Sequence, residues 1–294
     1  MNSGFEMVGI LPEKAVVEEK KPKLSKGRPV AAAVFLALVV LGCVCCRFVM
    51  TKDPTYMDLK NCSVPPGKEF IFGTDTMGRD IFSMVWYGGR LSLFIGVVSA
   101  FISTAIAVVV GSLSGCASKR IDSVIMRFTD IFLSIPEMLS VVFLQALLGN
   151  PNAVSIALVV GLTSWSGMAK VVRAEVKKLK SSGYMVAARC MGGGFFHVLV
   201  RHLIPNFFSS IMFMAVMNVR SAIVAESTLS FMGLGLPLET VSWGSMLSLA
   251  QKALLTDSWW IIVIPGVFLV GTLMSLTSIG NYMRKISVKK QSNL

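Results

Sequence analysis

Long apolar runs constrain this chain more than any other feature of its sequence. Residues 30–46 contain no Asp, Glu, Lys or Arg, and a second uncharged run, at residues 91–118, is longer. A helix needs about 20 mainly apolar residues to cross the bilayer core of about 30 Å, because each backbone donor must be paired within the segment. Further apolar runs follow at residues 131–148, 154–169, 204–236 and 259–279. The sequence therefore predicts an all-α, polytopic membrane protein with six transmembrane helices.

The distribution of Lys and Arg residues gives these spans an orientation. The chain has a formal net charge of +12 at pH 7. If the N-terminus is cytoplasmic and the spans alternate, the inside receives twenty Lys and Arg residues, the outside receives seven, and Arg220 lies in the fifth span. An excess of cytoplasmic Lys and Arg is the positive-inside pattern. It predicts that both termini are cytoplasmic, and it accounts for the basic charge without a nucleic-acid partner.

Composition divides the chain into four regions. Residues 1–27 are polar and charge-rich and are predicted to form a cytoplasmic tail. Residues 28–90 hold the first transmembrane helix and an external segment, residues 91–285 hold the other five helices, and residues 286–294 form a second cytoplasmic tail. Of the six cysteines only Cys62 is expected outside, so no disulfide framework is predicted. The two histidines, His197 and His202, have no metal-ligating company in the sequence.

The cytoplasmic loop between the fourth and fifth spans is longer than a turn requires. It is predicted to form two short helices around three consecutive glycines at residues 192–194, with Pro205 at the end of the second helix. Glycines permit a sharp reversal, and Pro205 cannot continue the hydrogen-bond ladder inside a helix. A bent helix pair at the inner surface is suited to docking a partner. Composition alone fits equally well with the alternative, a basic interfacial loop without a partner.

This loop resembles the cytoplasmic signature of type I ABC importer permeases: Glu-Ala-Ala, three residues, Gly, nine residues and Ile-x-Leu-Pro. The Ala pair, the Gly, the Pro and all spacings match, whereas Val186, His202 and Ile204 replace the Glu, Ile and Leu. The resemblance implies that residues 184–205 form a coupling helix that docks on an ATPase subunit. The residues expected to carry this coupling are Tyr184, Val186, Ala187, Ala188, Arg189, Gly192, His202 and Pro205.

Several denser motifs resemble the C-type permeases of peptide and nickel ABC importers. They are GTDTMGRDIFS at residues 73–83, YGGRLSL at 87–93, LSFMGLG at 229–235 and SWGSML at 242–247, together with Asp122, Met126, Arg127, Asp130, Pro136, Ala225 and Glu226. The resemblance covers residues 70–280. One departure is Asn281, which follows Gly280 where the family usually has an acidic residue.

The resemblance implies a type I importer fold with its permease core at residues 91–285, in a bacterial or archaeal cytoplasmic membrane. It also implies four kinds of partner: a second homologous permease, two ABC ATPase subunits, an extracytoplasmic solute-binding protein and the lipid bilayer. ATP and Mg would be bound by the ATPases, and no cofactor or metal by this chain. Short peptides are the expected solute, and nickel or a metal chelate is the alternative.

Ionisable residues inside the predicted spans are functional candidates, because a charge in the membrane must face protein or water. Arg127 and Asp130 are three residues apart, which predicts a structural ion pair on one helix face, with a gating role as the alternative. Arg220 and Glu226 are six apart and lie on different faces of a helix, so each is expected to line the solute path or gate, or to pair with another span. Glu137, just after Pro136, is expected to face protein or water.

Aromatic residues, glycines and missing motifs complete the sequence-based expectations. Trp243, Trp259 and Trp260 are expected as interfacial anchors, and Gly233 and Gly235 as sites of close helix approach or bending. The chain has no phosphate-binding loop and no set of nucleophile and base on one surface. The sequence therefore predicts a permease without catalytic residues. A membrane enzyme and a non-transporting scaffold are the weaker alternatives.

Overall fold

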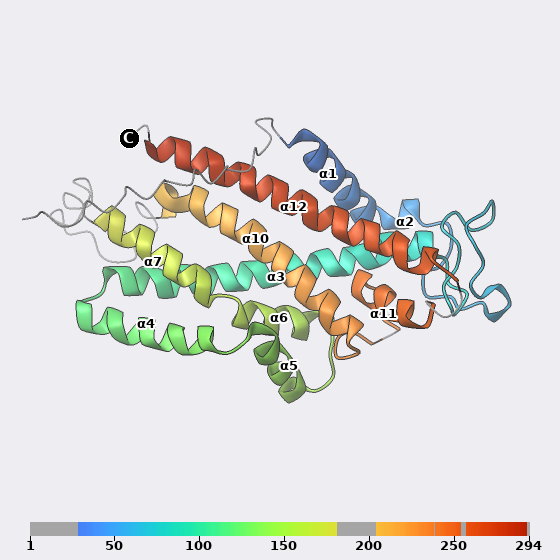
Figure 1. Ribbon diagram of the computed structural model, residues 1–294, viewed down its shortest axis with the longest axis horizontal. Helices are drawn as coiled ribbons and strands as arrows, with labels where there is room; N and C mark the ends of the chain where they lie inside the picture. Colours follow the sequence, from blue (N-terminus) through green and yellow to red (C-terminus); the bar gives the residue numbers. More distant parts are fainter. Residues whose placement is uncertain (1–28, 181–203, 238, 254–256, 293–294) are drawn as a thin grey trace, which may run out of the picture.

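A computed structural model describes residues 29–180, 204–237, 239–253 and 257–292 of the chain. Helices make up its ordered elements, and the described part contains one isolated β-bridge, between Thr74 and Asp80, but no strand. Three long helices run along the long axis of the molecule (Figure 1). They are α3 (Ile81–Cys116), α10 (Ile204–Phe231) and α12 (Trp260–Ser292). The predicted all-α class is confirmed.

Three segments are long and apolar enough to cross a membrane alone. They are α3, the part of α10 at Ile211–Phe231 and the part of α12 at Trp260–Ile286. The helix α1 (Val30–Val44) is apolar but has only 15 residues, and it continues into the short helix α2 (Cys46–Val49). The polytopic class therefore holds, whereas the count of six spans stays a prediction.

Two further spans are broken, which the apolar runs do not reveal. One consists of α4 (Lys119–Ser134) and α5 (Glu137–Leu148), bent by 87°, and the other of α6 (Ala153–Thr163) and α7 (Ser166–Lys180), bent by 47°. Pro136 accounts for the first break, because proline disfavours helical backbone in the residue before it and supplies no backbone donor. Ile135 is accordingly extended, at φ −89° and ψ 128°. Each break lies within a predicted span, but most of α4 and most of α7 lie outside the predicted spans at residues 131–148 and 154–169.

The helix α3 begins ten residues before the predicted start of the second span. Asp80 caps it by accepting hydrogen bonds from Ser83 N at 3.1 Å and Ser83 Oγ at 2.6 Å. Arg90, which was assigned to the external segment, lies inside the helix with its guanidinium carbon 4.8 Å from the centre of the Tyr87 ring. The helix therefore extends beyond the uncharged run on which the boundary at residue 91 was based, and that boundary stays a prediction.

Small residues allow other helices to lie directly against α3. A side chain at Gly111 would place its Cβ 2.5 Å from the backbone oxygen of Ala169 on α7. A side chain at Gly161 on α6 would meet Ile102 of α3 at 2.8 Å. Close helix approach through small residues is the usual packing mode within membranes. Both halves of the α6–α7 span are thereby packed on the same rod.

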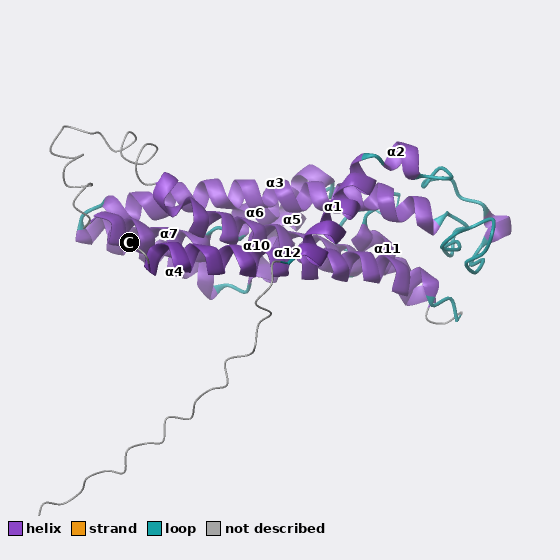
Figure 2. Cartoon of the chain, turned by 90° about the horizontal axis from the view of Figure 1, so that it is seen from above, coloured by secondary structure: helices purple, strands orange, loops and turns teal. Residues whose placement is uncertain are grey.

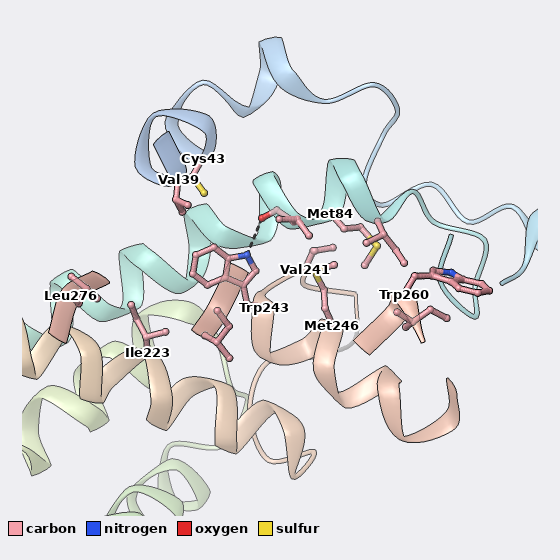
Figure 3. Close-up of a cluster of buried hydrophobic side chains, with 13 residues drawn as sticks. Val39, Cys43, Met84, Ile223, Val241, Trp243, Met246, Trp260 and Leu276 are labelled. Carbon is pink, nitrogen blue, oxygen red and sulfur yellow. Dashed lines mark hydrogen bonds between the residues drawn. The ribbon is translucent and has the colours of Figure 1, made fainter. Parts of the chain in front are cut away.

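One hydrophobic core surrounds Trp243, which starts the helix α11 (Trp243–Ala253) (Figure 3). Trp243 is 0% exposed, and its indole Nε1 donates to the Val85 backbone oxygen at 3.0 Å. Trp260 is also buried and donates to the Thr74 backbone oxygen at 3.1 Å. The interfacial positions expected for these two residues are therefore wrong, because buried tryptophans here find protein partners for their N–H groups. Trp259 remains 58% exposed.

The external segment is folded rather than an open loop. It contains the short 3-10 helix η1 (Leu59–Asn61), and Figure 2 shows its loops at the end of the bundle away from the last residues of α12. Arg79 and Asp75 form a buried ion pair with 2.7 Å between Nε and Oδ2. Gly78 has φ +75°, and a Cβ there would lie 1.8 Å from the Asp58 oxygen. These contacts give the motif at residues 73–83 a structural role, and we call this segment the external cap after the side on which the sequence predicts it.

Candidate functional site

The predicted coupling residues lie mainly outside the described residues. Tyr184, Val186, Ala187, Ala188, Arg189, Gly192 and His202 all fall within 181–203. Pro205 lies in the first turn of α10, where a missing backbone donor breaks no helical hydrogen bond. The last turns of α7 and the first turn of α10 lie at the same end of the bundle (Figure 1). The structure therefore describes the two helix ends, of α7 and of α10, between which the predicted coupling segment lies.

A buried carboxylate holds the last turns of α7 at this end. Asp122 on α4 is 4% exposed. It accepts hydrogen bonds from Arg173 Nε at 2.5 Å, Arg173 Nη2 at 2.6 Å and Lys177 Nζ at 2.5 Å. Ser114 Oγ, near the end of α3, donates to it at 2.5 Å. We call Asp122 and its three partners the Asp122 clamp, which joins α3, α4 and α7.

Several donors surround this single carboxylate, and three of their bonds come from charged groups. Such charge-assisted hydrogen bonds are roughly twice as strong as neutral ones. Arg173 and Lys177 are four residues apart on α7, a spacing at which like charges repel unless an anion lies between them. That spacing was the available signal for the clamp, although nothing in the sequence identified Asp122 as the anion.

The predicted pair of Arg127 and Asp130 is not formed. Asp130 Oδ1 lies 2.5 Å from Lys170 Nζ, so its ion pair joins α4 to α7. Among the described residues Arg127 has no ion pair with Asp130. A basic residue that precedes an acidic one along a helix is the less favourable order, whereas α7 packs beside α4 and brings Lys170 within reach. The pair is solvent-accessible, with side chains 43% and 53% exposed.

Glu226 lies inside the packing of this chain and at no described cavity. It is 0% exposed, and it accepts hydrogen bonds from Ser92 of α3 at 3.1 Å, Ser230 at 3.0 Å and Ser242 at 2.7 Å. These serine hydroxyls connect α10 to α3 and to the start of α11. The contacts favour structural pairing over the solute path, the two roles that the sequence left open for Glu226.

Arg220 is not brought together with Glu226. It lies on the part of α10 where side chains are half-buried, and no carboxylate of the described residues lies within ion-pair distance of it. Six residues of an α-helix correspond to about 9 Å along the axis and to different faces. Arg220 therefore remains a candidate for the solute path, separate from Glu226.

A cavity lined by both polar and apolar residues lies where the two breaks meet. Its volume is about 300 Å³, and it is lined by Pro136, Glu137, Ser140, Thr163 and Ser164, among others. Ser164 Oγ donates to Glu137 Oε1 at 2.6 Å, which joins the break of α4–α5 to the break of α6–α7. The sequence predicted that Glu137 faces protein or water, and the structure places it in this cavity. Ser164 was missed, because no proline or charged residue marks the second break.

No metal centre is found within the described part of the chain, where no group of three or more His, Cys, Asp and Glu side chains converges. Among the described cysteines, Cys43, Cys45, Cys46 and Cys62 are free thiols.

Comparison with known proteins gives one family and several relatives. The family described as "Binding-protein-dependent transport system inner membrane component" matches residues 107–292. The chain is 32% identical over 271 residues to a dipeptide transport system permease protein of Bacillus subtilis, with 92% of this chain and 84% of that protein covered. It is 34% identical over 251 residues to an oligopeptide transport system permease protein of the same organism, with 85% and 82% covered. A putative peptide permease protein of Brucella suis is 33% identical over 232 residues, with 79% and 76% covered.

Proposed function

The chain belongs to the family of inner-membrane components of binding-protein-dependent transport systems, and we propose that the solute it carries is a short peptide. The predicted resemblance to ABC importer permeases of the peptide type is confirmed by the family and by the relatives. The chain is accordingly a permease subunit without catalytic residues, as predicted, rather than a membrane enzyme.

The choice of a peptide as solute rests on the relatives. Two of them are named for dipeptide and oligopeptide transport, and a third is named as a putative peptide permease. Each shares about a third of its residues with this chain over most of both lengths. Nickel, the alternative that the sequence left open, appears in none of these names and is not favoured.

The proposed complex contains a second homologous permease, two ABC ATPase subunits and an extracytoplasmic binding protein. ATP and Mg are bound by the ATPases. The chain lies in a bacterial cytoplasmic membrane with both termini and residues 184–205 on the cytoplasmic side. This orientation is supported by the twenty-to-seven charge bias. It is also supported by the position of the external cap, which lies at the opposite end of the bundle from α7's last turns.

In the proposed mechanism, residues 184–205 dock on one ATPase and follow its closure when ATP binds. The segment is attached to α7 on one side and to α10 on the other, so a displacement of the ATPase reaches both helices. The Asp122 clamp ties α7 to α3 and α4. Alternating access then follows from the different stability of the inward-open and outward-open states with and without nucleotide and loaded binding protein.

The test is uptake by the complete complex. The permease pair and ATPases, reconstituted in liposomes with the binding protein outside, should accumulate a radiolabelled dipeptide or tripeptide only with ATP. Excess unlabelled peptide should compete with the label, and nickel should not. Accumulation of nickel without accumulation of any peptide would overturn the choice of solute while leaving the family assignment intact.

A further inference from the structure

The two broken spans meet at one place beside α3. Glu137 is the first residue of α5, and Ser164 directly follows α6. Their side chains are hydrogen-bonded at 2.6 Å, and the rings of Phe132 and Trp165 lie 5.4 Å apart between centroids. Trp165 belongs to the same buried cluster as Ala107 of α3. The breaks are therefore stacked on one another along the rod of α3.

The breaks lie at membrane depth. Glu137 follows the 16 residues of α4, which rise about 24 Å from the cytoplasmic turn at the start of that helix. Figure 1 shows α5 and the start of α7 partway along α3 rather than at either end. Non-helical backbone and carboxylates at this depth are tolerated where they are buried in protein or line a water-filled cavity. The paired breaks are therefore expected to face protein or water rather than lipid.

The lining of the cavity at the breaks is mixed, with Phe132, Leu133 and Ile135 beside its polar residues. Besides Glu137 the cavity is lined by the hydroxyl-bearing residues Ser140, Thr163, Ser164 and Ser166, and its volume is about 300 Å³. A volume of this size holds one end of a small solute rather than a whole extended peptide. The hydroxyls can donate or accept hydrogen bonds, so they adapt to a solute that passes through.

Glu137 gives this cavity a negative charge, although helix ends of both signs meet there, since α5 begins at Glu137 with a partial positive charge. A helix C-terminus carries a partial negative charge, and α6 ends at Thr163 beside the cavity. Glu137 adds a full carboxylate, which is solvent-exposed in this subunit and has a neutral hydroxyl as its recorded partner. No Lys, Arg or His of the described residues lies within ion-pair distance of it. Asp122 and Asp130 differ, because each is neutralised by basic residues of α7.

We propose that Glu137 lines the solute path at the paired breaks and accepts the α-ammonium group of a peptide in transit. An ammonium has three donors, which match the carboxylate of Glu137, the hydroxyl of Ser164 and the carbonyl end of α6. Every unblocked peptide carries this group whatever its side chains, so one carboxylate serves many sequences. This inference rests on the proposed peptide function.

The first experiment compares Glu137→Gln with wild type in the reconstituted complex. Asp130→Asn is the matched control, since it removes one negative charge from the same bent span outside the cavity. We expect Glu137→Gln to lower the rate of peptide uptake about tenfold or more, as a charge-assisted hydrogen bond is lost. ATP hydrolysis stimulated by loaded binding protein should stay within about twofold of wild type, since docking is untouched. Uptake by Glu137→Gln equal to that of Asp130→Asn would overturn the proposal.

The second experiment tests the contact itself. A carbodiimide joins a carboxylate to an amine in direct contact, so a labelled peptide should become linked to the fragment that contains Glu137 when the complex is trapped during turnover. The linkage should disappear in Glu137→Gln. A wild-type complex that transports the peptide but shows no linkage at Glu137 would refute this inference alone. A complex that transports no peptide would refute the proposed function instead.

Assembly of the variants also has a decisive outcome. If Glu137→Gln does not assemble, Glu137→Asp keeps the charge and is expected to assemble and to transport. Failure of both variants to assemble would assign Glu137 to the structure of the subunit and overturn its role in the path.

Discussion

Replacing Asp122 by Asn removes the charge of the Asp122 clamp with almost no change in shape. An amide oxygen can still accept from one donor, but its NH₂ group then faces Arg173 and Lys177, which have nothing to accept with. A hydrogen bond to a charged group contributes about 1.5–3 kcal/mol. The side chains of Arg173 and Lys177 are 29% and 44% exposed, so both can turn to solvent and recover part of the loss. We therefore expect a net destabilisation of about 2–3 kcal/mol.

Two measurements on Asp122→Asn separate stability from coupling. Thermal unfolding of the purified complex should show a lower midpoint than wild type. Asp130→Asn, which breaks an exposed pair, should lose no more than about 1 kcal/mol. The number of peptides moved per ATP hydrolysed should also fall in Asp122→Asn. A helix α7 that is held less firmly against α3 and α4 would transmit less of the coupling segment's movement to them. A stability and a transport ratio equal to those of Asp130→Asn would refute the reasoning.

Three further predictions concern other parts of the chain. Gly192→Asp should insert and pair normally but abolish ATPase binding or the stimulation of ATP hydrolysis by loaded binding protein, because a bulky residue displaces the docking helix; full stimulation would show that this loop is not the coupling element. An impermeant thiol reagent on intact cells should label Cys62, which is exposed, and spare Cys190; labelling of Cys190 alone would reverse the orientation. Glu226→Gln should lower the amount of folded protein in membranes, because the amide keeps only one of the two acceptor oxygens to which the serine hydroxyls donate; normal accumulation with impaired uptake would return Glu226 to the solute path.

The class and order of the helices could be predicted from the sequence because the bilayer imposes a simple condition on length and polarity. Residues 91–118 and 259–279 satisfy that condition, and α3 and α12 cover all of them except residues 117, 118 and 259. The length and polarity of an apolar run do not indicate whether the helix it forms is straight or broken. Pro136 marked one possible break, but nothing marked the break after Thr163, which depends on how α6 and α7 pack on α3.

The partners of charged residues were harder to predict than their presence. The sequence identified Asp130 and Glu226 as ionisable residues within or near predicted spans. It predicted that Asp130 pairs with Arg127 on the same helix, and it predicted no particular partner for Glu226. The observed partners, Lys170 and three serines, come from other helices or from residues without charge. Separation along the chain reaches 134 residues for Ser92 and Glu226, and only packing in three dimensions brings such groups together.

The length of α3 also determines how movement is amplified in this molecule. Its 36 residues form an unbroken rod about 54 Å long, whereas its neighbours α4–α5 and α6–α7 are jointed near the middle. One end of the rod is bound into the external cap through Asp80 and Trp243, and the other end is held by Ser114 in the Asp122 clamp. A tilt of about 10° about the capped end would swing the other end by about 9 Å. A small tilt of the unbroken rod at its capped end would therefore become a large displacement at the end held by the Asp122 clamp, whereas the jointed spans can bend at their breaks.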